Sequence, residues 1–249
     1  MKTHNGSSNV ATAHGSTTAH RARLESIVGR NWLKPYVHKD AIMDRRKYMD
    51  NTEVTQLRRN TENWAIADLA KGRKQGPLAW LLVDFALSTG LRVSEISIVS
   101  LADIDTKRSC ITVVRSKKRG KRQESLMIDS GLCAHLRDYI DHQRPDTASD
   151  SLWVGKRGPL TAQGLEVLWK RAVVLAGLTE RNPATSKTVA RYSIHCARHT
   201  NAVRLLKKTG NLRQVQKQLG HESPVITAKM YADISPEDMQ AGVEGLYDA

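Results

Sequence analysis

Residues 195–231 read HCARHTNAVRLLKKTGNLRQVQKQLGHESPVITAKMY. Apolar residues recur at helical spacing behind His195 and Arg198, so the first part predicts a helix that ends at Gly210. A second amphipathic helix is expected to follow directly and to end at Gly220. The stretch therefore predicts helices separated by glycine stops, with ionisable side chains placed near the helix ends.

The residues that follow the second glycine predict a turn and a third helix. His221 stands in the turn, and Ser223 followed by Pro224 has the pattern of an N-cap with proline at the first helical position. Tyr231 lies near the end of the expected helix. A guanidinium, two imidazoles and a phenol in this order indicate chemistry on a phosphate: His195, Arg198, His221 and Tyr231.

A second block lies about a hundred residues upstream and presents another arginine. Pro77 is expected to open a helix, PLAWLLVDFALSTG, that is apolar on nearly every side and should run through the middle of the domain. Gly90 ends this helix, and the chain continues as TGLRVSE over residues 89–95. Arg92 thus emerges at a sharp turn from a rigid, buried element.

Together the two blocks resemble the tyrosine recombinase, or phage integrase, family over roughly residues 50–234. The family's arginine turn matches TGLRVSE, and its H-x-x-R, L-G-H and tyrosine pattern matches the four residues above. The resemblance implies a mainly α fold with a small antiparallel β-sheet (α+β). It also implies a site-specific recombinase that cleaves and rejoins DNA through a covalent 3′-phosphotyrosine, without metal, cofactor or ATP.

The residue types fit that chemistry. Arg92 and Arg198 are expected to hold the two non-bridging oxygens of the phosphate, because planar guanidinium groups bind bidentately and stay charged. Tyr231 is the expected nucleophile, and its phenol, with an ordinary pKa near 10, needs a base or a strongly positive site. His195 is the candidate for handling that proton, and His221 for a hydrogen bond to the phosphate.

The leaving 5′-oxygen needs a proton donor, which in the resembled family is a lysine in a β-hairpin turn. Two short strands are expected at 110–115 and 123–128, joined by SKKRGKR. Comparison with the family's turns favours Lys117 as this acid, with the other two lysines of the turn as alternatives. The remaining cations are expected to bind DNA: Lys118, Arg119, Lys121 and Arg122. Glu95 resembles the family's acidic residue that orients the site.

Composition agrees with a polyanionic partner. The formal net charge of the 249 residues is +14, and each cation laid on a phosphate releases condensed counterions. Double-stranded DNA is the expected partner. The three cysteines form no C-x-x-C pair, and no apolar run is long enough to span a membrane, so a reduced, soluble, cytoplasmic and nucleoid-associated protein is expected.

Four segments are expected along the chain: a disordered tail (1–20), a basic arm with one short helix (21–48), the catalytic domain (49–234) and a C-terminal tail or short helix (235–249). Most family members carry an N-terminal helical domain that closes a clamp on DNA. Here the arm performs a reduced version of that task, or an accessory protein that bends DNA or completes the clamp supplies it. The family further implies a homo-oligomer, a dimer on one site and a tetramer in synapsis, with the C-terminal tail docked on a neighbouring protomer.

The rest of the catalytic domain is expected to be largely helical. A helix pair is predicted over 52–73, with Leu57, Trp64, Ile66 and Leu69 buried. Helices are also predicted over 133–142, with Tyr139 in the core, and after Thr161, which caps the helix. Leu152 and Val154 are assigned to a short strand, and residues 179–192 to a polar loop.

Bland alternatives exist for each motif. Residues 211–231 alone resemble a helix-turn-helix, which would make the protein a non-cleaving DNA-binding regulator. A type IB topoisomerase uses similar residues to relax supercoils. His195 and His199 have the i, i+4 spacing of a zinc helix, but no glutamate follows the first histidine and no third ligand is evident, so no metal site is predicted. The basic turn also resembles a nuclear localisation patch. The joint presence of both blocks favours the recombinase.

Overall fold

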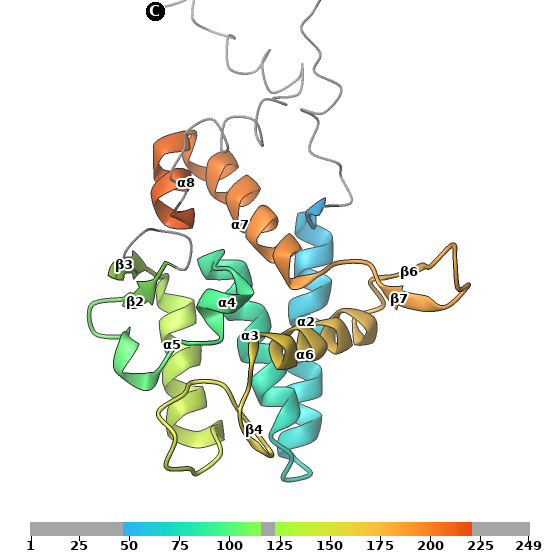
Figure 1. Ribbon diagram of the computed structural model, residues 1–249, viewed down its shortest axis with the longest axis horizontal. Helices are drawn as coiled ribbons and strands as arrows, with labels where there is room; N and C mark the ends of the chain where they lie inside the picture. The colour runs from blue at the N-terminus through green and yellow to red at the C-terminus, as the bar shows by residue number, and fades with distance from the viewer. Residues whose placement is uncertain (1–46, 116–122, 221–249) are drawn as a thin grey trace, which may run out of the picture. The chain divides into compact units, whose positions relative to one another are not determined.

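The computed structural model describes residues 47–115 and 123–220 of the chain. Predictions that concern residues 1–46, 116–122 and 221–249 lie outside the described residues. Within the described part the protein is mainly helical with three small antiparallel sheets, which confirms the predicted fold class (Figure 1).

The described elements follow one another in a simple order. The α-helices are α2 (Asn51–Leu69), α3 (Gln75–Thr89), α4 (Val93–Ile96), α5 (Ser130–Asp138), α6 (Ala162–Leu175), α7 (Ile194–Thr209) and α8 (Leu212–Leu219). The strands are β1 (Ile104–Asp105), β2 (Cys110–Val114), β3 (Gln123–Met127), β4 (Val154–Gly155), β5 (Gly158–Pro159), β6 (Thr179–Arg181) and β7 (Thr188–Ala190). Short 3-10 and π turns occupy Leu101–Asp103 and Tyr139–Gln143.

Helix α2 is a single helix, so the prediction of a helix pair over 52–73 is wrong. A capping box fixes its start: the Asp50 carboxylate accepts from Glu53 N at 2.8 Å, and the Glu53 carboxylate accepts from Asp50 N at 2.9 Å. No glycine or proline interrupts the next 19 residues, so the helix continues to Leu69.

The buried face of α2 also differs from the prediction. Leu57 is fully buried as expected, but Ile66 is 59% exposed and Leu69 is 39% exposed. The buried residues recur every three or four positions: Val54, Leu57, Thr61, Ala65 and Asp68. Ile66 and Leu69 lie off this stripe, because the helix packs chiefly against α3 and presents only one face to it.

Helix α3 is the central element, as predicted, and begins two residues before Pro77. It packs against α2, α5, α6 and α7, which leaves almost no side of it exposed. Its buried apolar residues accordingly surround the helix axis: Leu78, Ala79, Leu81, Leu82, Val83, Phe85, Ala86 and Leu87. Gly90 ends the helix in the left-handed region, with φ of 64°.

The predicted strands at 110–115 and 123–128 are confirmed to within one residue as β2 and β3. They pair antiparallel, with Ile111 opposite Leu126, and both of these side chains point into the core. Strand β1, which the sequence pattern did not indicate, adds to the other edge of β2. Helix α5 then begins at Asp129, whose carboxylate accepts from Leu132 N at 3.0 Å.

The predicted helix over 133–142 is α5 followed by the π turn. Tyr139 lies at the junction and is fully buried, which confirms its assignment to the core. Burial raises the pKa of the Tyr139 phenol above its ordinary value, and the charge of Arg144 opposes this only in part. This phenol therefore stays neutral at physiological pH and has the opposite environment to the one a nucleophile needs.

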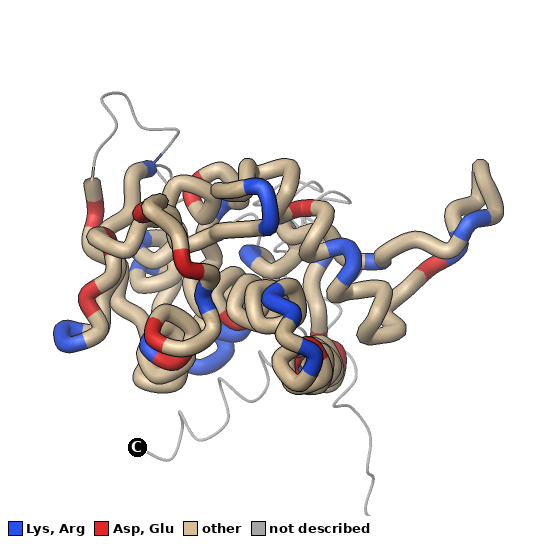
Figure 2. Tube along the Cα trace, turned by 90° about the horizontal axis from the view of Figure 1, so that it is seen from below, with Lys and Arg blue, Asp and Glu red and all other residues tan. Residues whose placement is uncertain are grey.

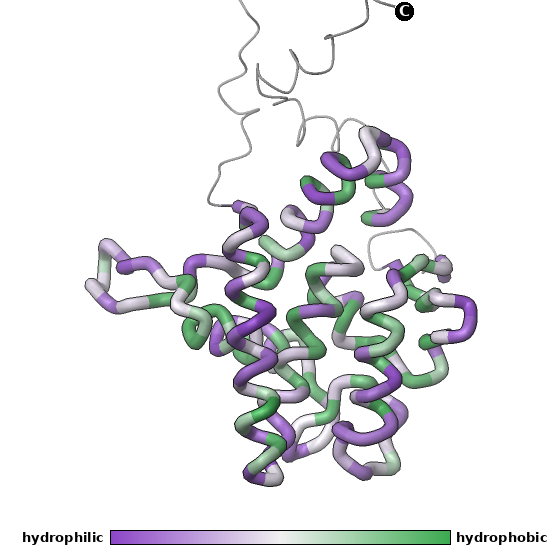
Figure 3. The backbone as a smooth tube through the Cα atoms, turned by 180° about the vertical axis from the view of Figure 1, so that it is seen from behind, coloured by the Kyte–Doolittle hydropathy of each residue, from purple (hydrophilic) through white to green (hydrophobic). Residues whose placement is uncertain are grey.

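Two features of the second half differ from expectation. Leu152 lies outside the short strand β4, which begins at Val154 and pairs with β5. Residues 179–192, predicted as a loop, contain the β6–β7 hairpin, which Figure 3 shows as a largely hydrophilic arm beside the helices. Helix α6 follows Thr161 as predicted, because the Thr161 hydroxyl accepts from Gly164 N at 3.2 Å.

Two general expectations concern cysteines and membranes. All three cysteines are free; Cys133 is buried, whereas Cys110 and Cys196 are only partly so. No helix among residues 47–115 and 123–220 combines the length and the apolar character needed to cross a bilayer.

Candidate active site

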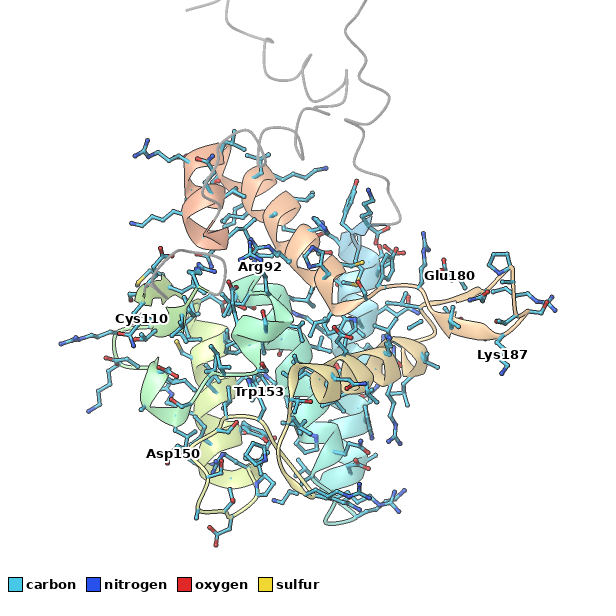
Figure 4. The ribbon with its side chains drawn as sticks, viewed as in Figure 1. Arg92, Cys110, Asp150, Trp153, Glu180 and Lys187 are labelled. Atoms are coloured by element: carbon cyan, nitrogen blue, oxygen red, sulfur yellow. The ribbon has the colours of Figure 1, made fainter. Side chains whose placement is uncertain are left out.

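Arg92 lies where α3 ends and α4 begins. The left-handed turn at Gly90 reverses the chain, and Arg92 becomes the N-cap residue of α4. Its Nη1 donates to Glu95 Oε1 at 2.8 Å, and its backbone N donates to Glu95 Oε2 at 3.0 Å. The Glu95 side chain is fully buried, whereas that of Arg92 is 20% exposed. The carboxylate therefore fixes the arginine while its guanidinium still reaches the surface (Figure 4).

Arg198 is buried in α7, with 3% of its surface exposed. Its Nη1 donates to the carbonyl oxygen of Gly90 at 2.8 Å, and its Nη2 donates to that of Leu219 at 2.8 Å. The first carbonyl lies two residues before Arg92, and the second lies two residues before His221. The structure thus brings the two predicted arginine blocks together and joins both to the end of α8.

Helix α7 is anchored at both of its sides. Tyr192, just before the helix, donates its hydroxyl to Glu53 Oε1 of α2 at 2.7 Å. Asn201 donates from its amide to the carbonyls of Leu87 and Ser88, each at 2.9 Å. These contacts hold Arg198 at a fixed height against the last turn of α3. Asn201 is a supporting residue that the sequence pattern did not indicate.

Gly90 is needed for two separate reasons. Its φ of 64° is costly for any residue with a side chain, and a Cβ there would meet Asn201 Oδ1 at 2.7 Å and Leu219 Cδ2 at 2.8 Å. Gly210 has nearly the same φ, 62°, and nothing lies within 4 Å of the position of its Cβ. The two glycines therefore separate backbone strain from steric overlap.

We predict that Gly90→Ala lowers the free energy of unfolding clearly more than Gly210→Ala. The backbone conformation costs about 1 kcal/mol in both variants, and overpacking adds about 1–3 kcal/mol at Gly90 alone. Urea unfolding followed by circular dichroism measures both. Equal losses in the two variants would show that Asn201 and Leu219 move aside freely and do not fix the turn.

His195 lies in the first turn of α7 and is exposed, so it shares the helix with Arg198 but not its burial. Its ring lies edge-on to that of His199, with 4.9 Å between the ring centroids. Among residues 47–115 and 123–220, no three His, Cys, Asp or Glu side chains are grouped closely enough to hold a metal ion.

Arg115 belongs to the site but was not predicted from the sequence. It follows β2 and, with Arg198, is one of the two buried arginines in the described part of the chain. Its guanidinium contacts Glu95, Glu124 and the carbonyl of Gln218. The only available signal was an arginine at the end of an alternating strand, where the buried face of the strand continues.

Further cations lie beside the site, and Figure 2 shows lysine and arginine positions along the described helices and hairpins. A surface depression next to the C-terminal end of α3 is lined by Arg58, Arg204, Lys207 and Lys208 among other residues. Burial, and then the charge of Arg58, lower the pKa of Arg204 from its ordinary value. Such mutual repulsion of cations is relieved by a bound anion.

Several predicted site residues lie outside the described residues. These are Lys117, Lys118, Arg119, Lys121 and Arg122 of the hairpin turn, and His221 and Tyr231. Of the predicted set, the structure describes Arg92, Glu95, His195 and Arg198. Hydrogen bonds connect Arg92 to Glu95 and connect Arg198 to the backbone beside Arg92.

Solved structures with a similar arrangement of elements are recombinases. The crystal structure of XerA recombinase is 24% identical, covers 79% of this chain and 63% of that chain, and gives a TM-score of 0.60. XerH site-specific recombinase bound to difH substrate is 20% identical, covers 80% of this chain and 54% of that chain, and gives a TM-score of 0.61. At these identities the likeness establishes the fold.

Sequence comparison establishes the family. Tyrosine recombinase XerC of Roseiflexus sp. (strain RS-1) is 31% identical over 161 residues, which are 62% of this chain and 47% of that protein. XerC of Mycobacterium leprae (strain TN) is 29% identical over 189 residues, 72% of this chain and 59% of that protein. The chain thus spans about half the length of the curated relatives it matches. Since the sequence profile of the phage integrase family matches residues 47–238, well over half of the chain, this protein belongs to the phage integrase family.

Proposed function

We propose that this protein is a site-specific DNA recombinase that cleaves and rejoins DNA through a covalent bond to Tyr231. The observation that carries the proposal is the placement of Arg198, whose guanidinium bonds to the backbone beside Arg92 and to the end of α8. Two fixed cations from distant parts of the chain at one place suit a phosphate, and preorganised groups of this kind stabilise the charge of a transition state.

The proposed step exchanges one ester bond for another. The phenolic oxygen of Tyr231 forms a bond to phosphorus, and the bond from phosphorus to the 5′-oxygen breaks. The phenolic proton passes to His195, and Lys117 delivers a proton to the leaving 5′-oxygen. Arg92 and Arg198 hold the non-bridging oxygens, and His221 donates a hydrogen bond to the same phosphate. Because the phosphotyrosine conserves the bond energy, a second DNA strand reverses the step without ATP.

We further propose that the protein acts on double-stranded DNA as a homo-oligomer, a dimer on one site and a tetramer in synapsis. The C-terminal residues 235–249 would dock on a neighbouring protomer, and an accessory DNA-bending or clamp-completing protein would assist. The net charge of +14 supports the choice of DNA. A DNA substrate also places the protein in the cytoplasm, in association with the nucleoid.

Covalent capture tests the proposal on any DNA, whatever the sequence of the target site. We predict that the wild-type chain, mixed with fragments of its source genome in EDTA and then denatured with SDS, carries DNA covalently. Sequencing of the captured DNA should yield one site, and two duplexes with that site should exchange strands. Specific binding without an adduct would establish a regulator, and supercoil relaxation without exchange would establish a topoisomerase.

A further inference from the structure

Arg115 is a buried cation that ends a strand. Only 1% of its side chain is exposed, and a charge removed from water in this way is costly unless it is paired and hydrogen bonded. Each guanidinium nitrogen meets this need on a different element. Nε lies 3.1 Å from Glu124 Oε2 of β3, Nη1 lies 3.5 Å from Glu95 Oε2 of α4, and Nη2 donates to the carbonyl of Gln218 in α8 at 2.8 Å.

These contacts extend to the proposed phosphate ligand. Glu95 lies between two arginines: its Oε1 accepts from Arg92, and its Oε2 faces Arg115. Glu124, Arg115, Glu95 and Arg92 thus form a row of alternating charge, which we name the four-charge row. Because the Glu95 side chain is fully buried, the share of its charge that Arg115 neutralises determines how strongly it draws on Arg92.

The same guanidinium also supports the end of α8. Gly220 ends that helix with φ of 65°, and a Cβ there would meet Arg115 Nε at 2.6 Å and Cζ at 2.8 Å. Only a glycine allows the arginine to lie this close. Arg115 and Arg198 donate to the consecutive carbonyls of Gln218 and Leu219, immediately before His221.

We propose that Arg115 is a positioning residue for the cleavage step, which acts through Glu95 on Arg92 and through Gln218 on the end of α8. This inference rests on the proposed function. Arg115 itself does not touch the phosphate, since its three nitrogens contact protein groups and its side chain is buried. Without it, the buried Glu95 carboxylate pulls the Arg92 guanidinium toward itself and away from the oxygens of the phosphate.

The test is the variant Arg115→Met, which keeps the length of the side chain and removes its charge. Single-turnover cleavage is measured on the duplex recovered by covalent capture and on the same duplex with a methylphosphonate at the scissile position. A methylphosphonate has a neutral methyl group in place of one charged oxygen, so its cleavage depends less on Arg92.

We predict that Arg115→Met slows cleavage of the phosphodiester by about 100-fold, the scale expected when a reacting group is misplaced by about 1 Å. The loss on the methylphosphonate should be several-fold smaller. The matched control is Arg108→Met in the same sheet region, because the Arg108 side chain is 84% exposed and lies 3.8 Å from Asp105. This control should cleave both substrates at wild-type rates.

Equal losses on the two substrates, or wild-type rates in Arg115→Met, overturn the inference. Arg115→Lys carries the same comparison if the methionine variant does not fold. A second measurement uses an Arg92→Lys background on the phosphodiester: a residue that acts through Arg92 loses little more there, whereas an independent structural effect multiplies the two losses. Absence of an adduct in the wild-type chain would instead refute the proposed function.

Discussion

Tyr231→Phe is expected to abolish the covalent protein–DNA adduct while DNA binding is retained. Phenylalanine keeps the ring and removes the single oxygen that forms the bond to phosphorus, so no other property of the surface changes. The loss should be complete at any reaction time, since no neighbouring group replaces a missing nucleophile in an in-line displacement. Gel analysis after SDS treatment measures the adduct, and a mobility shift on the captured duplex measures binding.

Tyr139→Phe and Tyr192→Phe are the controls for this variant. Tyr139 is fully buried with its pKa raised, and Tyr192 is engaged with Glu53, so both variants should still form the adduct. An undiminished adduct in Tyr231→Phe would remove the nucleophile assignment. Loss of the adduct in a control variant that remains folded would direct attention to that tyrosine instead.

Arg198→Lys should lower the rate of cleavage by about 100- to 1000-fold, the range typical when one preorganised donor of a transition state is lost. Lysine keeps the positive charge but lacks the planar fork that donates to Gly90 and Leu219 together. The charge is therefore conserved while the geometry is not. Single-turnover cleavage of the captured duplex measures the effect.

The stability of this variant should fall as well, because leaving a buried carbonyl without its donor costs about 1–3 kcal/mol. Arg137→Lys is the control, since Arg137 is an exposed arginine in α5. It should match the wild type in cleavage and in urea unfolding. A normal cleavage rate in a destabilised Arg198→Lys would show that Arg198 is structural and does not act on the phosphate.

The sequence by itself determined the features that depend on neighbouring residues. Helices α3, α7 and α8 were predicted because apolar spacing and glycine stops are local signals. The family was predicted for a similar reason, since its two motifs are short blocks that keep their internal spacing. Local signals failed where they were weak: nothing in the hydrophilic residues 179–192 showed the alternation of a strand, and the β6–β7 hairpin is defined by its backbone pairing.

Only the tertiary structure decided which charged residues are buried and what they contact. Arg198 meets a carbonyl 108 residues away, and Arg115 meets one 103 residues away. The burial of an arginine is favourable only when partners converge on it from several elements, and that convergence depends on how the helices pack. The sequence therefore identified Arg92 and Arg198 as candidates, whereas the fold joined them and added Arg115 to the same site.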